Sequence, residues 1–492
     1  MATAPSISFN VNTRALGQVQ TGIGVLVVMF GICSAGTPNA VYSYAGSASS
    51  SQAATDLGIG PLSEAVQYQL SRANAQVFVV PITPTYLSLP SNVTHVGTST
   101  GTFGVVASGP TDGTHYSAWD HGQWIVKFIS GGVVGTATFQ FSKDNGTTWS
   151  TTRTTAASVT LETGLAVTFV TSATTFVAGD TYSFTAYEPT FSTSDMGAAI
   201  TAAFTPNNPY QMIHIVGSDM GTSDSASATA YASRVAALET AIGTQATRTR
   251  FVDAFIDGPR VAANSTSDGL IIAAFASTVA SDVGATAGMQ TQPNTLDGFS
   301  VPRSVAWPFV GKSRLVDLAQ TTWARNVVID PGIISIDTDS ATRPALNTAN
   351  FCTLTTMAGL QGFYGCNAPT LAAAGSDLNS IEHNNVMNLA KSTAFAALAP
   401  VLGSAVIVDK TTGFISQQSA LGIEKNTLLQ LRGVLTQTGG VQRASFVSFQ
   451  VTRDNNILST KQLVAQLGIV PLGYVETILV NISFVNPTVI AA

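Results

Sequence analysis

The stretch around Ser99 has the spacing of a serine-hydrolase nucleophile. Gly97, Ser99 and Gly101 match the G-x-S-x-G pattern, which requires its serine on a sharp turn between a buried strand and a helix. The residues on either side of this motif are polar and show neither a strand pattern nor a helix pattern. We therefore interpret Ser99 as a loop residue and expect no nucleophile there.

The remaining catalytic and ligand-binding motifs are incomplete. Residues 311–313 resemble the end of a phosphate-binding loop, but Ala306 stands where the first glycine belongs. Asp337 and Asp339 resemble the start of a calcium loop that lacks its later glycine and glutamate. We expect no cofactor and no metal, and we predict that the protein is not an enzyme.

The histidines and cysteines do not form ligand sets either. The chain has five scattered histidines, none paired at metal-ligand spacing: His95, His115, His121, His214 and His383. His115 and His121 are expected on the surface, whereas His214 lies in an apolar run and is interpreted as a core histidine rather than a base. The three cysteines are expected to be buried, reduced thiols: Cys33, Cys352 and Cys366.

Residues 142–149 match the Asp-box hairpin pattern, S-x-D-x-G-x-T-W. In such a hairpin Asp144 accepts bonds from backbone amides, Gly146 takes a positive φ and Trp149 packs beneath the turn. Sialidases carry these hairpins in repeated copies away from their active sites. A single copy predicts a stable hairpin and not a glycosidase.

The composition is unusual, because only 10% of the 492 residues are charged, against roughly 25% in ordinary soluble domains. Either a membrane or neighbouring subunits would explain so few charges. The longest apolar run, from Gly22 to Cys33, is shorter than the roughly 20 residues that span a bilayer, and no signal peptide precedes it. We expect no membrane insertion, and assembly in a cytoplasm. The net charge of −6, with 21 dispersed Lys and Arg residues, predicts no nucleic-acid partner.

Alternating strand and helix patterns predict an α/β core that is interrupted by a β-rich insert. An apolar strand at 23–32 precedes a helix after Gly60 and a strand at 77–80. Residues 81–113 are rich in Pro, Thr, Ser and Gly and are interpreted as a linker. Four short alternating strands between 122 and 187 then predict a small β-sandwich, and the α/β pattern returns at residue 210.

The predicted fold class is therefore α/β plus β, multidomain, with extended terminal arms. We predict five segments: an N-terminal arm (1–20), the first part of the α/β domain with its linker (21–105), the inserted β-sandwich (106–188), the second part of the α/β domain (189–375), and a C-terminal α/β module with a terminal strand arm (376–492).

The C-terminal module is predicted to contain a helix near 377–399, a strand at 404–409, a helix ending before Gly439 and a strand at 445–454. The chain then closes with a long strand at 474–485, on which one face carries Ile478, Val480, Ile482 and Phe484. A long apolar-faced strand at a terminus needs a partner. We predict that these four residues form an inter-subunit arm; packing on the strand's own subunit is the alternative.

This organisation resembles the contractile tail sheath family of phages and related injection machines. The N-terminal resemblance lies in TGIGVLVVMFGICSAGTPN, LGIGPL and EAVQYQLSRANAQVFVVPI, and the C-terminal resemblance in GYVETILVNISFVNP. GTATFQFSKDNGTTWS and FVAGDTYSFTA are similar to small β-domains that decorate tail proteins. Residues 259–375 have no segment-by-segment match.

The resemblance implies a structural subunit that polymerises helically, in stacked rings, around an inner tail tube and contracts to drive that tube through the target envelope. It implies the tube, baseplate and tail terminator proteins as partners, and a virion tail assembled in a bacterial cytoplasm. The alternative function is that of a virion-surface or secreted carbohydrate-binding protein, with Trp119, Trp124 and Trp149 of the insert as the binding residues.

Overall fold

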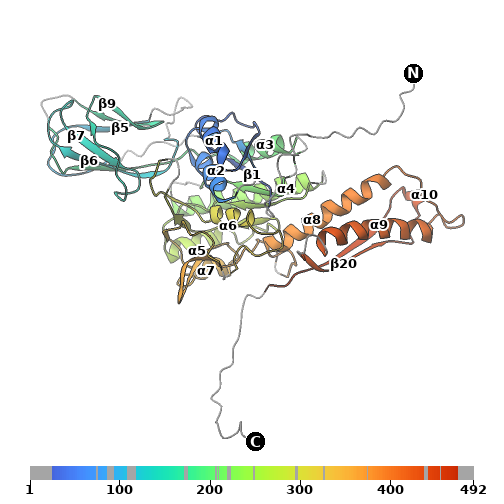
Figure 1. Cartoon of the computed structure of the whole chain (residues 1–492). Helices are drawn as coiled ribbons and strands as arrows, with labels where there is room; N and C mark the ends of the chain where they lie inside the picture. The colour runs from blue at the N-terminus through green and yellow to red at the C-terminus, as the bar shows by residue number, and fades with distance from the viewer. Residues whose placement is uncertain are drawn as a thin grey trace, which may run out of the picture. The chain divides into compact units, whose positions relative to one another are not determined.

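The computed structural model describes residues 25–73, 76–85, 93–107, 118–170, 175–205, 208, 210–218, 223–247, 250–293, 297–324, 327–373, 375–436, 442–454 and 456–474. The predicted N-terminal arm and the terminal-strand residues Ile478, Val480, Ile482 and Phe484 lie outside these ranges. The chain forms two compact units, one up to Ala396 and one from Ala397 (Figure 1).

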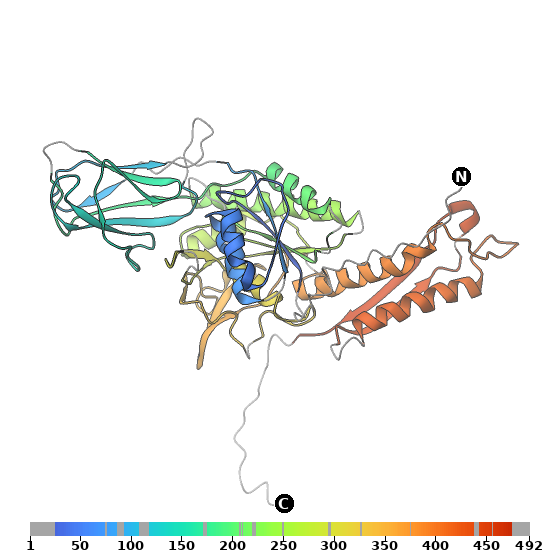
Figure 2. The ribbon, with the colours of Figure 1, turned by 45° about the horizontal axis from the view of Figure 1, so that its top comes forward.

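The first unit is built on a six-stranded sheet with a parallel centre (Figure 2). The strand order is β14 (Val283–Ala285), β13 (Asp253–Ile256), β12 (Met212–Ile215), β1 (Val27–Gly31), β3 (Gln76–Pro81) and β2 (Tyr42–Ala45), of which β2 runs antiparallel at the edge. The central strands are short apolar runs buried on both faces, as expected for a parallel sheet covered by helices. The predicted α/β character is confirmed.

Side chains alternate between the two faces of this sheet. Phe30 and Ile215 belong to a core shared with helices on one face: α3 (Thr193–Phe204), α4 (Asp224–Ala246) and α5 (Ser265–Ala274). The other face carries α2 (Pro61–Arg72) and α6 (Ala306–Ser313), where the rings of Phe255 and Phe309 lie 5.7 Å apart. Helix α2 follows η2 (Ser47–Ser49) and α1 (Ser50–Leu57). It begins at the carboxyl end of β1, where Leu62 N donates to Ile32 O at 3.1 Å.

The described residues between 93 and 186 form two antiparallel sheets, here named the β-region. The first contains β5 (Phe103–Ala107), β10 (Leu165–Phe169) and β9 (Ser158–Glu162); the second contains β4 (Thr94–Val96), β11 (Thr181–Ala186), β6 (Gly122–Ser130), β7 (Thr138–Ser142) and β8 (Arg153–Thr154). One aromatic cluster, with Trp124, Phe128, Phe139 and Phe169 among its members, joins the two sheets. The chain enters and leaves this region side by side, because Thr85 and Thr190 exchange backbone hydrogen bonds of 2.7 and 2.9 Å.

The linker predicted at 81–113 is wrong in part, because strands β4 and β5 lie within this range. Their sequences are rich in Thr, Gly and Val and look unstructured in isolation. Phe103–Ala107 becomes a strand because it pairs antiparallel with β10, about 60 residues later in the chain. The Asp-box prediction is confirmed: Gly146 has a φ of 85°, and Asp144 Oδ1 accepts from Thr148 N at 2.8 Å.

The rest of the first unit has small elements around a loop-rich stretch. They are the sheet of β16 (Pro302–Ser304), β15 (Met289–Thr291) and β17 (Ser335–Ile336), helix α7 (Ala345–Thr348), the hairpin β18 (Leu354–Met357) and β19 (Leu360–Gly365), and helix α8 (Ile381–Leu398), whose end reaches the second unit.

The second unit pairs one long helix with one hairpin. Its elements are η3 (Ala399–Val401), α9 (Gln417–Leu435), β20 (Ala444–Val451), α10 (Ile457–Thr460) and β21 (Ala465–Pro471). Helix α9 packs on β20, whose Val447, Phe449 and Val451 are buried as the alternation predicts. The strand predicted at 404–409 is wrong, because this segment is largely exposed and only its Val408 bridges, to Ile415.

Candidate functional site

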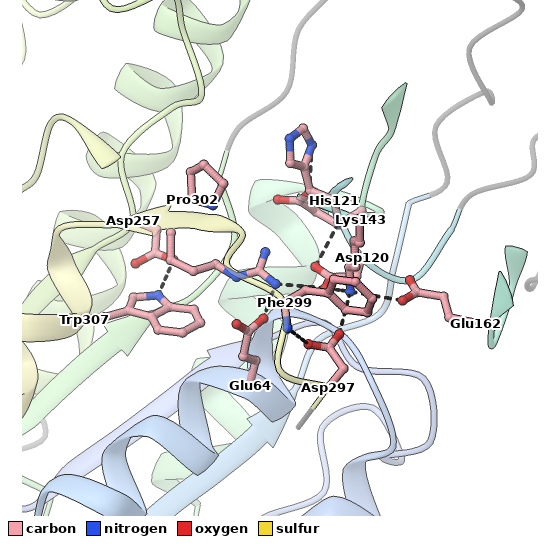
Figure 3. A network of polar contacts seen from close by, with 12 residues as sticks. Glu64, Asp120, His121, Lys143, Glu162, Asp257, Asp297, Phe299, Pro302 and Trp307 are labelled. Atoms are coloured by element: carbon pink, nitrogen blue, oxygen red, sulfur yellow. Dashed lines mark hydrogen bonds and ion pairs between the residues drawn. The ribbon is translucent and has the colours of Figure 1, made fainter. Parts of the chain in front are cut away.

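A group of mostly buried charges joins the β-region to the α/β sheet (Figure 3). Its six members, here named the charge network, are Glu64, Asp120, Lys143, Glu162, Asp297 and Arg303. Glu64 lies near the start of α2 and Arg303 in β16, whereas Lys143 follows β7 and Glu162 ends β9. The network therefore connects elements from both sides of the junction.

Lys143 is surrounded by carboxylates. Its Nζ lies 2.6 Å from Asp120 Oδ2, 3.0 Å from Glu162 Oε2 and 3.2 Å from Asp297 Oδ2. The side chain is 3% exposed, so these three contacts replace the water that an ammonium group would otherwise bind. Gly122 leaves room for this side chain, since a Cβ there would lie 2.7 Å from Lys143 Cγ.

Asp120 links Lys143 to the α/β side of the junction. The same Oδ2 atom that contacts Lys143 lies 2.8 Å from Arg303 Nη2, and this guanidinium also binds Glu64 Oε2. Arg303 is 2% exposed, and its guanidinium lies 5.8 Å from the Trp307 ring. One buried carboxylate therefore bridges a cation of the β-region, Lys143, and a cation of strand β16, Arg303.

Burial and the neighbouring charges shift the pKa values of these groups in opposite directions. Burial alone would raise the pKa of Asp120, but Arg303 and Lys143 more than offset it and hold that pKa below its usual range. Burial would lower the pKa of Lys143, yet the carboxylates of Asp120, Glu162 and Asp297 raise it well above its ordinary value. The central acid and its cations are therefore ionised in the folded protein.

The outer carboxylates behave differently. Burial raises the pKa of Glu64 to about 7 despite Arg303, and it raises the pKa of Glu162 to about 7 despite Lys143. Two cations face four carboxylates, so complete ionisation would leave excess negative charge. Proton uptake by Glu64 and Glu162 near neutral pH reduces that excess.

Apolar contacts reinforce the same junction. Phe299 and Val301 come more than a hundred residues after the β-region, yet both belong to its aromatic core. The rings of Phe299 and Phe141 lie 6.0 Å apart, and Ser300 N donates to Asp144 Oδ2 at 3.0 Å. Conversely, Trp119 is 7% exposed and packs in the core of the α/β sheet. Each side of the junction thus completes the other's core.

His121 is buried, so the surface position predicted for it is wrong. It is 8% exposed, beside Glu188 and Arg260, with 3.8 Å between His121 Nδ1 and Glu188 Oε2. Burial, and then the cations of Arg260 and Arg303, lower its pKa well below the usual value, so the ring is neutral. His121 and Arg260 are among the residues that line a pocket of about 450 Å³. His115 lies outside the described residues.

His214 is a core residue, as predicted. It is fully buried in β12, and its Nε2 lies 3.0 Å from Asp257 Oδ1. Asp257 Oδ2 accepts from Trp307 Nε1 at 3.1 Å and from Gly217 N at 3.0 Å. These bonds tie the carboxyl ends of β12 and β13 to helix α6, and they present no surface to a substrate.

Ser99 lies in the loop between β4 and β5, not on a strand–helix turn. Its hydroxyl donates to Asp180 Oδ2 at 2.5 Å and accepts from Val177 N at 2.9 Å. His95 lies 3.6 Å from the same Asp180 oxygen, so the histidine contacts the aspartate rather than the serine. The arrangement fastens a loop and lacks the serine–base contact of a hydrolase.

The other sequence motifs also have structural roles. Residues 311–313 lie in helix α6. Asp337 Oδ1 accepts from Met289 N of β15, and Asp339 Oδ1 accepts from Ala341 N. Within the described ranges, no group of three or more His, Cys, Asp or Glu side chains could hold a metal ion. Cys33 and Cys352 are buried and Cys366 is partly buried, all as free thiols.

The aromatic residues of the carbohydrate-binding alternative do not form a platform. Trp124 is 1% exposed inside the β-region and Trp119 is packed in the sheet core. Trp149 is the partly exposed member of the three, with Lys127 Nζ 5.8 Å from its ring. Sugar binding by these three residues together is therefore not supported.

No protein-family model and no curated protein matches the sequence. Solved structures match it over almost its whole length. The contracted sheath of an extracellular contractile injection system, PVC, covers 98% of this chain and 98% of its own, with a TM-score of 0.51 and 8% identity. The chain has the fold of a contractile sheath protein.

Two further matches were found. The contracted helical sheath of the anti-feeding prophage covers 98% of this chain and 99% of its own, with a TM-score of 0.49 and 10% identity. A sheath tail protein from Listeria innocua covers 92% of this chain and 96% of its own, with a TM-score of 0.43 and 12% identity. Within the described part of this sheath-fold chain, no helix is long and apolar enough to cross a membrane.

None of the sequence patterns indicated the charge network. Glu64 and Arg303 are 239 residues apart in the chain, and Asp120 and Arg303 are 183 apart, so no local spacing relates them. Lys143 was included in the Asp-box only at a variable position of the pattern. In the sheath fold the network has the character of a structural clamp, with buried ions that are neutralised rather than exposed to a ligand.

Replacing Lys143 by methionine should weaken the sheath-fold protein strongly. The substitution keeps most of the side-chain volume and removes the cation that Asp120, Glu162 and Asp297 share, which leaves the buried Asp120 with Arg303 alone. Because an uncompensated buried charge is costly, we expect a loss of about 3–5 kcal/mol in the free energy of unfolding. Urea denaturation followed by tryptophan fluorescence measures it. Lys127→Met, at an exposed position of β6, is the matched control and should cost under about 1 kcal/mol. Equally small losses of unfolding free energy in both variants would contradict the stabilising role of Lys143.

Glu162→Gln should change how stability depends on pH. The folded-state pKa of about 7 exceeds the ordinary 4.5, so the folded protein holds this proton more tightly. The resulting stability is full below pH 4.5 and is lost as pH rises through 7. Glutamine keeps an acceptor for Lys143 and cannot ionise. Relative to the parent, the stability of the variant in urea denaturation should therefore rise by about 1.3 kcal/mol from pH 6 to pH 8.

The control for this experiment is Glu424→Gln in the second unit. Its bond to Arg453 lowers the pKa of Glu424, which thus stays ionised from pH 6 to pH 8. That substitution should shift stability equally at both pH values. The same behaviour in Glu162→Gln would show that Glu162 does not carry a raised pKa.

Proposed function

We propose that the protein is the structural subunit of a contractile sheath. In this proposal it polymerises helically around an inner tube and contracts to drive that tube through a target envelope. The observation that carries the proposal is the match to a contracted injection-system sheath across 98% of both chains. The inner tube, baseplate and terminator proteins are proposed as its partners, in a tail assembled in a bacterial cytoplasm.

The chemistry of the described residues supports a structural role. Ser99 and His214 each bond an aspartate and do not contact each other. The ions of the charge network contact one another, which supports a role in stabilising the fold. We propose that the protein catalyses no reaction, and that the β-region is an inserted domain held rigidly by the charge network instead of a freely moving decoration.

Subunits are proposed to link through strand addition at the second unit. The hairpin of β20 and β21 is two-stranded, and no other described strand pairs with its outer edges. Exposed edges of this kind accept further strands. The segment 474–485, with Ile478, Val480, Ile482 and Phe484 on one face, is the strand that we propose is donated to a neighbouring copy. Each buried side chain of this kind contributes roughly 1.5–3 kcal/mol to the joint.

Ending the chain at Gly473 should abolish assembly without unfolding the protein. Electron microscopy of the purified full chain is expected to show tubes, whereas the truncated chain should remain a soluble monomer with an unchanged circular dichroism spectrum. If the truncated chain still forms tubes, the strand does not link the subunits. Unfolding of the truncated chain would place the strand in its own subunit's core, and a full chain that never polymerises would contradict the sheath function itself.

A further inference from the structure

The second unit carries an apolar groove next to its hairpin. The groove has a volume of about 470 Å³ and is lined mainly by aliphatic side chains: Leu398, Val401, Leu402, Val406, Ile457 and Val464. Leu402 is 76% exposed and Val464 is 45% exposed, and nearby in the chain Ile407 and Leu458 are 65% and 67% exposed. A concentration of exposed aliphatic side chains of this kind marks a binding surface.

The groove lies at the beginning of strand β21. Val464 lines the groove and directly precedes Ala465, the first residue of β21. At this end of the hairpin Ala465 pairs with Val451, and at the opposite end Ala444 pairs with Pro471. The groove therefore lies where β21 begins, and the chain leaves the hairpin at the other end.

Of the two hairpin strands, β21 is the more exposed. Helix α9 packs on β20, where Val447 and Val451 are almost fully buried. Every residue of β21 is at least partly exposed. A strand added antiparallel to β21 runs toward Ala465, so the residues that follow this strand arrive at the groove.

The length of the chain beyond the structure suits this path. β21 has seven residues, whereas 18 residues follow Tyr474. A strand that pairs with β21 therefore leaves several residues over. These residues include Pro487, which cannot continue a strand ladder, and then the aliphatic Val489 and Ile490.

A neighbouring copy is the better source of this segment than the same chain. To pair with its own β21, the chain would have to reverse direction after Pro471 and return along that strand. Leu472, Gly473 and Tyr474 form no turn, and Gly473 lacks the positive φ that a tight reversal would use. The described residues that follow β21 therefore show no reversal toward their own hairpin.

We propose that residues 486–492 of one copy occupy the apolar groove of a second copy, with Val489 and Ile490 against Leu402 and Val464. This docking rests on the proposed strand link and adds a second, side-chain-specific contact at its end. The strand supplies backbone hydrogen bonds, and the groove supplies a defined end point that fixes the register of the strand.

Disulfide capture between full-length copies tests the docking. One copy carries Val464→Cys and the other carries Val489→Cys, and the two are co-expressed and oxidised. We expect a covalent dimer that a reductant reverses and that neither variant gives alone. Leu429→Cys, at a 69% exposed position of α9 outside the groove, is the matched control partner and should give no dimer. Absence of the Val464–Val489 dimer from assembled tubes overturns the proposal. A disulfide formed only within a single chain that carries both cysteines also overturns it.

Tube stability provides an independent readout. A chain ending at Val485 keeps the strand, so it should still form tubes, and these should dissociate at least fivefold faster after dilution. Leu402→Asp should have a similar effect, and combining the two changes should add little because both remove one contact. Leu429→Asp should leave the rate unchanged. If tubes form and none of these variants differs from the parent, the docking fails while the sheath function stands. If the full chain forms no tubes, the sheath function fails and the docking with it.

Discussion

Two buried cations, Lys143 and Arg303, constrain much of the first unit. Neither can remain buried unless carboxylates lie within hydrogen-bond distance, and Asp120 reaches both. This requirement fixes helix α2, strand β16 and the Asp-box hairpin relative to one another. Phe299 and Trp119 then fill the cores on either side of the contact. We therefore expect the β-region and the parallel sheet to unfold together, in one cooperative event.

A rigid unit of this kind suits the proposed function. In the proposed sheath, subunits change position during contraction while each keeps its own fold. Contacts inside a subunit must therefore be rigid, whereas the links between subunits must be flexible. The charge network provides rigid contacts within the first unit. The open hairpin and the apolar groove of the second unit would provide the links between subunits. The low overall charge fits the same account, because an assembled subunit exposes less of its surface to water than a monomer.

The sequence predicted those features that depend on neighbouring residues. The apolar strands of the sheet, the alternation of Val447, Phe449 and Val451, and the Asp-box turn at Gly146 were all recognisable from local patterns. Features that depend on distant partners were missed. Strand β5 forms only because β10 pairs with it, and the segment 404–409 stays irregular because it gains no neighbouring strand apart from one bridge. His121 and Glu64 are polar residues whose burial depends on partners far along the chain, so the surface position expected for His121 was wrong.

Hydrogen exchange of backbone amides tests most directly whether the two parts form one cooperative piece. The amides of β6 and β7 in the β-region would be compared with those of β1 and β12 in the sheet, under native conditions with increasing denaturant. The account predicts that the most protected amides of both sets exchange with the same opening free energy and the same denaturant dependence, through one shared unfolding event. Exchange of β6 and β7 at a clearly lower free energy, while β1 and β12 remain protected, would contradict it.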